Sequence, residues 1–222
     1  MDVNFDDLLA GSDDELLAQL LAEDGFSAQD DVIKAREGDG PVALSFAQQR
    51  LWLLDQLDGG DAYLVPSELM LKGPVDVMAM ELAINDLVQR HEALRTTFTL
   101  VDGEPVQNII PELSFTLGVT DLSETDNQDH ALEQMLQLNS STPFDLSKAP
   151  LLRVQLVKLA SEMHVLLFCL HHIISDMWSG QLMIKELSEA YSARISGENP
   201  PWEPLRLHYA DYAAWQRNWF KG

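Results

Sequence analysis

The sequence predicts a mixed fold of helices and strands, α/β or α+β, built around one mixed sheet that helices flank. Segments with apolar residues at helical spacing alternate along the chain with short runs of β-type residues. The pair Asp102-Gly103 between two such runs is a strong signal for a β-hairpin. Apolar residues make up 46% of the 222 residues, which is ample for a packed core.

The first 40 residues are predicted to form a separate acidic helical leader and linker. Ser12-Asp13-Asp14-Glu15 has the form of a helix-capping box, and Asp30 to Gly40 has the composition of a polar linker. The apolar stripe after the capping box consists of Leu16, Leu17, Leu20 and Leu21. The segment holds 12 acidic and two basic residues, hence a formal charge of -10. Two interpretations stay open: a helix that packs on the main domain, or a docking element for a basic partner tail.

From residue 41 onward the chain is expected to form one lobe, beginning with an amphipathic helix at Ser45–Leu57 and a strand at Ser67–Leu71. A long helix is predicted at Asp76–Leu94. Its core side consists of Met80, Ala83, Ile84, Leu87 and Val88. The hairpin joins Thr96–Val101 to Pro105–Ile110.

The second half of the chain continues the mixture of elements. The predicted elements are a polar loop at 121–130, a helix at Ala131–Ser140, strands at Leu151–Leu159 and His164–Leu170, a helix at Met177–Ile195, a proline-rich segment at Glu198–Leu205 and a short aromatic helix ending at Trp219.

Composition narrows the function classes. A net charge of -22 argues against binding to nucleic acid or to anionic membrane surfaces, both of which need basic patches. The single cysteine, Cys169, cannot form an internal disulfide and is expected to be a small buried hydrophobe. No apolar run approaches the ~20 residues of a membrane span, and the acidic start does not resemble a signal peptide. A cytoplasmic location is therefore expected.

Two adjacent histidines are the clearest candidate site. His171 and His172 follow the apolar run Val165–Leu170, and Asp176 lies four residues after the second histidine. Successive strand residues point to opposite faces, so only one histidine can face a given cleft. An imidazole can exchange a proton near neutral pH, and Asp176 could pair with an arginine. In the alternative interpretation, the histidines pack in a polar core and Asp176 caps the following helix.

The stretch His171-His172-Ile173-Ile174-Ser175-Asp176 resembles the HHxxxDG core of condensation domains in nonribosomal peptide synthetases. Further segments resemble motifs of that family in the expected order. They are Leu44–Trp52 (SxAQxRLW), Arg90–Phe98 (RHExLRTxF), Pro143–Leu146 followed by Pro150–Arg153, and Tyr209–Gln216 (YxDYAxWQ). Met177 stands where the family usually has glycine, and its bulk is expected to change the substrate channel.

The resemblance implies a fold and a reaction. Condensation domains resemble two chloramphenicol-acetyltransferase-like lobes that face each other. Residues 41–222 match the amino-terminal lobe, and the carboxy-terminal lobe is absent, so the isolated lobe is expected to be inactive. The family forms an amide when the acceptor's α-amine attacks the donor thioester. Both groups are attached to phosphopantetheine arms of donor and acceptor carrier proteins, so neither a bound cofactor nor a metal is expected on this chain.

The resemblance also assigns roles to residues. His172 is the expected catalytic residue, as a proton acceptor, an orienting group for the amine or a hydrogen-bond donor to the oxyanion. His171 is expected to point into the protein, and Asp176 to form a buried ion pair with Arg50, or else with Arg95. Packing or structural roles are expected for Ser179, Trp178, His91 and His208.

Other interpretations remain open. A related HxxxD acyltransferase would use free thioesters, and an epimerisation domain shares the histidine motif but follows a carrier domain. A docking fragment would bind a carrier without any chemistry. Because the chain begins at Met1, we expect it to open a polypeptide and to receive its donor from an upstream synthetase subunit through residues 1–40.

Overall fold

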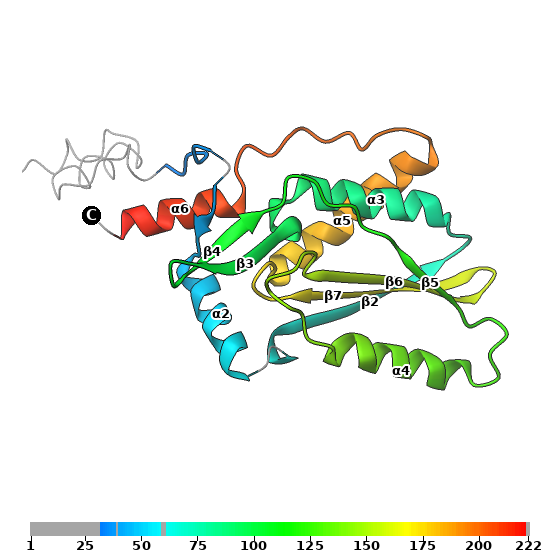
Figure 1. Ribbon diagram of the computed structural model, residues 1–222. Helices are drawn as coiled ribbons and strands as arrows, with labels where there is room; N and C mark the ends of the chain where they lie inside the picture. The colour runs from blue at the N-terminus through cyan, green and yellow to red at the C-terminus, as the bar shows by residue number, and fades with distance from the viewer. Residues whose placement is uncertain (1–31, 39, 59–60, 221–222) are drawn as a thin grey trace, which may run out of the picture.

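The computed structural model describes residues 32–38, 40–58 and 61–220. The capping box and leucine stripe of the predicted leader lie outside these residues. The described chain forms two sheets with helices around them (Figure 1).

The larger sheet has four strands in the order β2-β7-β6-β5. Its strands are β2 (Leu64–Lys72), β5 (Gly118–Asp121), β6 (Leu152–Ala160) and β7 (Met163–His171). β7 pairs antiparallel with both neighbours, whereas β5 runs parallel to β6. The sheet is therefore mixed, as the sequence predicts.

Helices cover both faces of this sheet. α3 (Val77–Arg90) and α5 (Met177–Ile195) lie on one face, and α4 (Gln128–Ser141) lies on the other (Figure 1). On the first face, Leu166, Phe168 and Leu170 of β7 join the main core, while Val165 and Leu167 pack under α4. Because both faces are covered, β7 is buried along nearly all its length, which explains its continuous apolar run.

The hairpin forms a second, smaller sheet, so the expectation of one sheet was wrong. β3 (Thr96–Val101) pairs with β4 (Glu104–Ile109), and β4 pairs with β1 (Val42–Ala43). Asp102 and Gly103 both have positive φ, at 52° and 85°, as a tight hairpin turn requires. β4 pairs with β1, and neither hairpin strand extends the larger sheet, so the two sheets are separate.

Two helices join the small sheet to the rest of the molecule. α2 (Phe46–Asp58) starts directly after β1, and α6 (Tyr209–Trp219) packs against that start. The Arg217 guanidinium donates to the carbonyl of Leu44 at 2.6 Å, and the backbone N–H of Phe46 donates to Gln216 at 3.0 Å. The two ends of the lobe are thereby held together.

Several predicted boundaries differ from the observed ones. The predicted long helix ends at Arg90 because His91 adopts an extended conformation, and a 3-10 turn (Glu92–Arg95) follows. The 121–130 region includes the end of β5, which the sequence interpretation missed, and the first residues of α4. A second 3-10 turn (Asp61–Tyr63) precedes β2.

The predicted linker is tied to the lobe before residue 41. The backbone and the guanidinium of Arg36 donate to the Asp211 carboxylate at 3.0 and 2.9 Å, and Arg36 also pairs with Glu92 at 2.9 Å. Asp211 is buried at the start of α6. The packed unit therefore includes residues that the 1–40 and 41–222 division assigned to the leader.

Candidate active site

The paired histidines lie where β7 ends, in a turn held by the backbone. The N–H of His171 donates to Leu151 at 3.1 Å, and the N–H of His172 donates to Tyr63 at 2.8 Å. The carbonyl of His171 accepts from Ile174 at 3.1 Å. The two imidazoles leave this turn on opposite sides: His171 is 0% exposed, whereas His172 is exposed.

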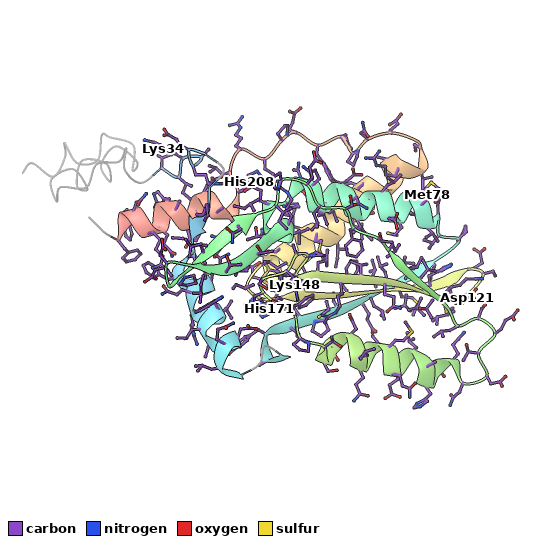
Figure 2. The ribbon with its side chains drawn as sticks, viewed as in Figure 1. Lys34, Met78, Asp121, Lys148, His171 and His208 are labelled. Carbon is purple, nitrogen blue, oxygen red and sulfur yellow. The ribbon has the colours of Figure 1, made fainter. Side chains whose placement is uncertain are left out.

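His171 is part of the interior between α2 and the end of the larger sheet (Figure 2). Its Nδ1 accepts the backbone N–H of Ile173 at 3.1 Å, and its Nε2 faces Oδ1 of Asp55 at 3.4 Å. The rings of Tyr63 and Phe144 lie 6.4 and 6.5 Å from its ring. Burial, with a smaller contribution from His172, lowers the pKa of His171 to about 4. His171 is therefore neutral at pH 7 and serves the turn as a hydrogen-bond acceptor.

His172 lines a cavity of about 200 Å³ between α2, the turn after β7, the 3-10 turn at Glu92–Arg95 and the first turns of α5 and α6. α2 contributes Ala47, Gln48 and Leu51, and the turn after β7 contributes His172 and its neighbours. The remaining lining residues are Ala93, Asp176, Ser179 and Tyr209. Among the described residues, the His172 imidazole has no hydrogen bond, so its ring nitrogens are available to a bound molecule.

The start of α2 supports this cavity through a capping box. Ser45 Oγ accepts the N–H of Gln48 at 3.1 Å, and Gln48 Oε1 accepts the N–H of Ser45 at 3.0 Å. The amide nitrogen of the buried Gln48 then donates to Gln107 at 3.1 Å and to the carbonyl of Ile173 at 3.4 Å. Ser45 also bonds the hydroxyl of Tyr209 at 2.9 Å. The Ser-x-x-Gln spacing at 45–48 was the signal that could have identified this support.

Within the described part of the chain, Asp176 forms no ion pair with an arginine, in contrast to what the family resemblance implied. It caps α5: its carboxylate accepts the N–H and the hydroxyl of Ser179 at 2.7 and 2.6 Å, and these bonds lower its pKa. It is exposed. Arg95 is buried and donates to the carbonyl of Ile110 at 2.6 Å, and Arg50 is exposed without a hydrogen bond or ion pair to any described residue. The helix-capping interpretation is the one observed.

Met177 does not constrict the cavity. It is the first residue of α5 and is 83% exposed, and it does not line the cavity at His172. Its φ is not positive, so this position does not need the conformational freedom of glycine. Trp178 is also exposed, at 79%, which places two large apolar side chains on the surface beside the candidate site.

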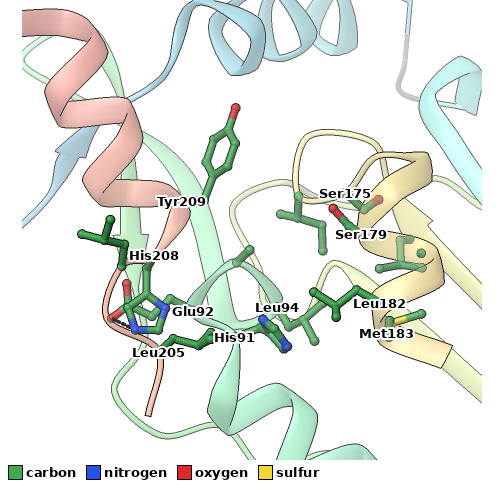
Figure 3. A pocket seen from close by; sticks show the side chains of 15 residues that line it. His91, Glu92, Leu94, Ser175, Ser179, Leu182, Met183, Leu205, His208 and Tyr209 are labelled. Carbon is green, nitrogen blue, oxygen red and sulfur yellow. Dashed lines mark ion pairs between the residues drawn. The ribbon is translucent and has the colours of Figure 1, made fainter. Parts of the chain in front are cut away.

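A second cavity of about 190 Å³ shares a wall with the first (Figure 3). The residues common to both cavities are Ala93, Ile174, Ser175, Ser179 and Tyr209. Its apolar lining includes Leu94, Leu182 and Met183, whereas His91, Glu92 and His208 supply polar groups (Figure 3). The candidate site therefore adjoins a mostly apolar space.

His91, His208 and Cys169 occupy structural positions. His91 contacts the buried Glu186, which also pairs with Arg90 at 3.0 Å. His208 starts α6, and its backbone N–H donates to Asp211 at 2.6 Å. Cys169 is 0% exposed, and burial raises the pKa of its thiol, as befits a small buried hydrophobe.

Within residues 32–38, 40–58 and 61–220, no cluster of three or more histidine, cysteine, aspartate or glutamate residues could hold a metal ion. None of the helices in this part of the chain has the length and apolar character needed to cross a membrane.

Comparison with known proteins places the chain in a family. Residues 39–221 match the model of the condensation domain. Malpinin synthetase of Mortierella alpina is 43% identical over 83% of this chain, and gramicidin S synthase 2 of Brevibacillus brevis is 38% identical over 85%. The chain spans only 2% and 4% of the lengths of these two relatives.

Comparison with solved structures gives the same family. The X-domain from teicoplanin biosynthesis superposes with a TM-score of 0.78 at 31% identity, over 86% of this chain and 41% of its own. The first condensation domain of the calcium-dependent antibiotic synthetase, in complex with a substrate analogue, gives a TM-score of 0.74 at 25% identity, over 82% and 44%. The fold, the ordered motifs and the match over residues 39–221 show that this chain belongs to the condensation domain family of nonribosomal peptide synthetases.

Proposed function

We propose that the chain is the amino-terminal lobe of a condensation domain that forms an amide between two carrier-bound groups. The acceptor's α-amine attacks the carbonyl carbon of the donor thioester, the C–S bond breaks, and the donor arm leaves as a thiol. The amine must lose a proton during this reaction. We assign His172 to accept that proton.

The main support for this role of His172 is that its imidazole is exposed in its cavity and makes no hydrogen bond to a described residue. The other titratable side chains of the cavity wall are engaged: Asp176 is bonded to Ser179, and Tyr209 to Ser45. An imidazole changes charge between pH 5 and 8, which suits proton transfer from an amine near neutral pH.

The second cavity supports a substrate with an apolar part. It shares lining residues with the cavity at His172, and most of its lining is apolar. An acyl or amino-acid side chain could enter it while the reacting atoms stay near His172.

The proposal includes partners that the described residues do not contain. Phosphopantetheine arms belong to donor and acceptor carrier proteins, and a second lobe completes the domain, because the chain covers 41–44% of the related solved chains. We therefore expect the isolated chain to be inactive. We also propose that residues 1–40 bind an upstream synthetase subunit and that the protein is cytoplasmic.

The test uses carriers loaded with a donor acyl group and an acceptor aminoacyl group. They are incubated with a polypeptide that continues this chain into the second lobe of a condensation domain, and the arms are examined by mass spectrometry. The proposal predicts an acceptor arm heavier by the donor acyl group. Inversion of the acceptor's α-carbon without a mass change would identify an epimerisation domain instead. Transfer from a free thioester in the absence of carriers would identify a different acyltransferase.

A second candidate function is binding without chemistry. One related X-domain was solved in complex with OxyB, so a domain of this fold can serve as a binding partner. If carriers are retained by the two-lobe polypeptide in a pull-down but no acyl group moves, this second candidate is favoured.

A further inference from the structure

Two buried polar atoms face each other beneath the candidate site. Nε2 of His171 and Oδ1 of Asp55 have no hydrogen-bond partner among the described residues, and they are 3.4 Å apart. His171 comes from the end of β7, and Asp55 comes from the carboxyl half of α2. His171 is fully buried, and the Asp55 side chain is only 10% exposed. The reaction proposed above uses neither group.

The hydrogen-bond pattern fixes where the proton of His171 lies. Nδ1 accepts the N–H of Ile173 and therefore carries no proton. The neutral ring must then carry its proton on Nε2, which faces the Asp55 carboxylate. A buried N–H without an acceptor is unfavourable, and so is a buried carboxylate oxygen without a donor. The Nε2–H of His171 can therefore act as the donor that Asp55 Oδ1 lacks, and Oδ1 as the acceptor that Nε2–H lacks.

We propose that Asp55 is a positioning residue that accepts the Nε2–H of His171 and thereby holds the turn that presents His172. With its proton fixed on Nε2, His171 keeps Nδ1 free to accept the N–H of Ile173. That bond closes the turn immediately after His172. The consequence for turnover rests on the proposed function, whereas the tautomer of His171 does not.

The Asp55 carboxyl lacks a cationic partner among the described residues, so an N–H donor at Oδ1 would stabilise its charged form. Asp55 forms no ion pair with a lysine or arginine in the described chain; its second oxygen accepts from Gln56 at 3.2 Å. Burial raises its pKa, and the nearby Asp145 adds to that rise. The rings of Phe144 and Tyr63 lie beside the fully buried His171 ring.

The first test needs no activity. Ring ¹⁵N chemical shifts of the full 222-residue chain report which nitrogen of His171 carries the proton. The proposal predicts the Nε2–H tautomer at pH 7 in the parent and in Asp55→Asn, because an amide oxygen can still accept. Asp55→Leu removes the acceptor and should give a mixture of tautomers. An unchanged tautomer in Asp55→Leu, or a loss of the Nε2–H form in Asp55→Asn, would overturn the proposal.

The second test measures condensation by the two-lobe polypeptide. Asp55→Leu is expected to lower kcat about 10- to 100-fold with the carrier KM unchanged, because the turn is misplaced while carrier binding is untouched. Asp55→Asn should stay within about threefold of the parent. The matched control is Asp126→Leu, which changes an exposed aspartate in the loop before α4.

The two hypotheses fail in different ways. If His172→Ala keeps full activity in the same assay, the proposed function fails, and the ¹⁵N result alone decides the role of Asp55. If His172→Ala is inactive but Asp55→Leu turns over like the parent, the positioning role is refuted. If Asp55→Leu does not fold, a kcat loss in Asp55→Asn as large as that in His172→Ala would refute it.

Discussion

The buried His171 makes a sharp prediction about acid stability. In the unfolded chain a histidine titrates near pH 6.5, whereas burial lowers the pKa of His171 to about 4 in the folded chain. As the pH falls below about 6.5, the histidine becomes protonated in the unfolded state but stays neutral in the folded state. The free energy of unfolding therefore falls. The full difference is about 3 kcal/mol, reached below pH 4, of which about 2 kcal/mol is lost between pH 7.5 and 5.

The perturbation is His171→Asn. The amide oxygen of asparagine can accept the N–H of Ile173 in place of Nδ1, but asparagine does not titrate. Unfolding by urea is measured at pH 7.5 and pH 5 for the parent and the variant. Asp55, whose raised pKa has the opposite effect on acid stability, is present in both chains, so its contribution largely cancels. The matched control is His130→Asn, which replaces an exposed histidine.

The expected result is a difference between the two chains. The parent should lose about 2 kcal/mol more than His171→Asn on going from pH 7.5 to 5. The free energy of unfolding of His130→Asn should fall by as much as that of the parent, because this variant keeps the buried ring of His171. Equal losses in the parent and His171→Asn would refute the argument that the buried ring resists protonation.

Three further predictions concern single side chains. Arg36→Ala should lower the free energy of unfolding by about 2–3 kcal/mol in urea, because two carboxylates lose their shared cation. The control is Lys34→Ala, which removes an exposed side chain and should change this free energy little. Equal effects of the two substitutions would contradict the anchoring role of Arg36. Asp176→Ala should cost only about 1 kcal/mol, or about 2–4 °C in Tm, since it removes a helix cap; a loss of 3–5 kcal/mol would instead indicate a buried ion pair. The thiol of Cys169 should react with a thiol reagent only after unfolding, and rapid reaction of the native chain would show that it is not buried.

The sequence predicted the parts of the fold that local patterns determine. The run of apolar residues located β7, because a strand covered on both faces needs no alternation. The predicted bounds of α5 agree with the observed ones, since Asp176 provides a local cap at its start. Alternation along the strand also indicated that one histidine would be buried and the other would face a cleft.

The errors arose where tertiary contacts outweigh local patterns. Periodicity continued the long helix to Leu94, but the chain leaves the helix at His91, which contacts Glu186 of α5. β5 is short and contains a glycine, and its strand character depends on pairing with β6.

The sequence predicted only part of the candidate site, because some of its contacts join residues that no local pattern relates. The arginine partner expected for Asp176 is not observed, because Ser179, three residues away, satisfies the carboxylate locally. Asp55 could not have been identified, since no spacing rule relates it to His171, which lies 116 residues later. The assignment of His172 as the catalytic residue stays a prediction.

The most direct test of that assignment is a single-turnover rate of amide formation. The two-lobe polypeptide and its His172→Ala and His130→Ala variants are mixed with excess loaded carriers, and the condensed product on the acceptor arm is followed in time. If His172 takes the amine proton, His172→Ala should be about 10²- to 10⁴-fold slower than the parent, while His130→Ala keeps the parent rate. Equal rates for all three would contradict the account and show that the reaction proceeds without the imidazole of His172.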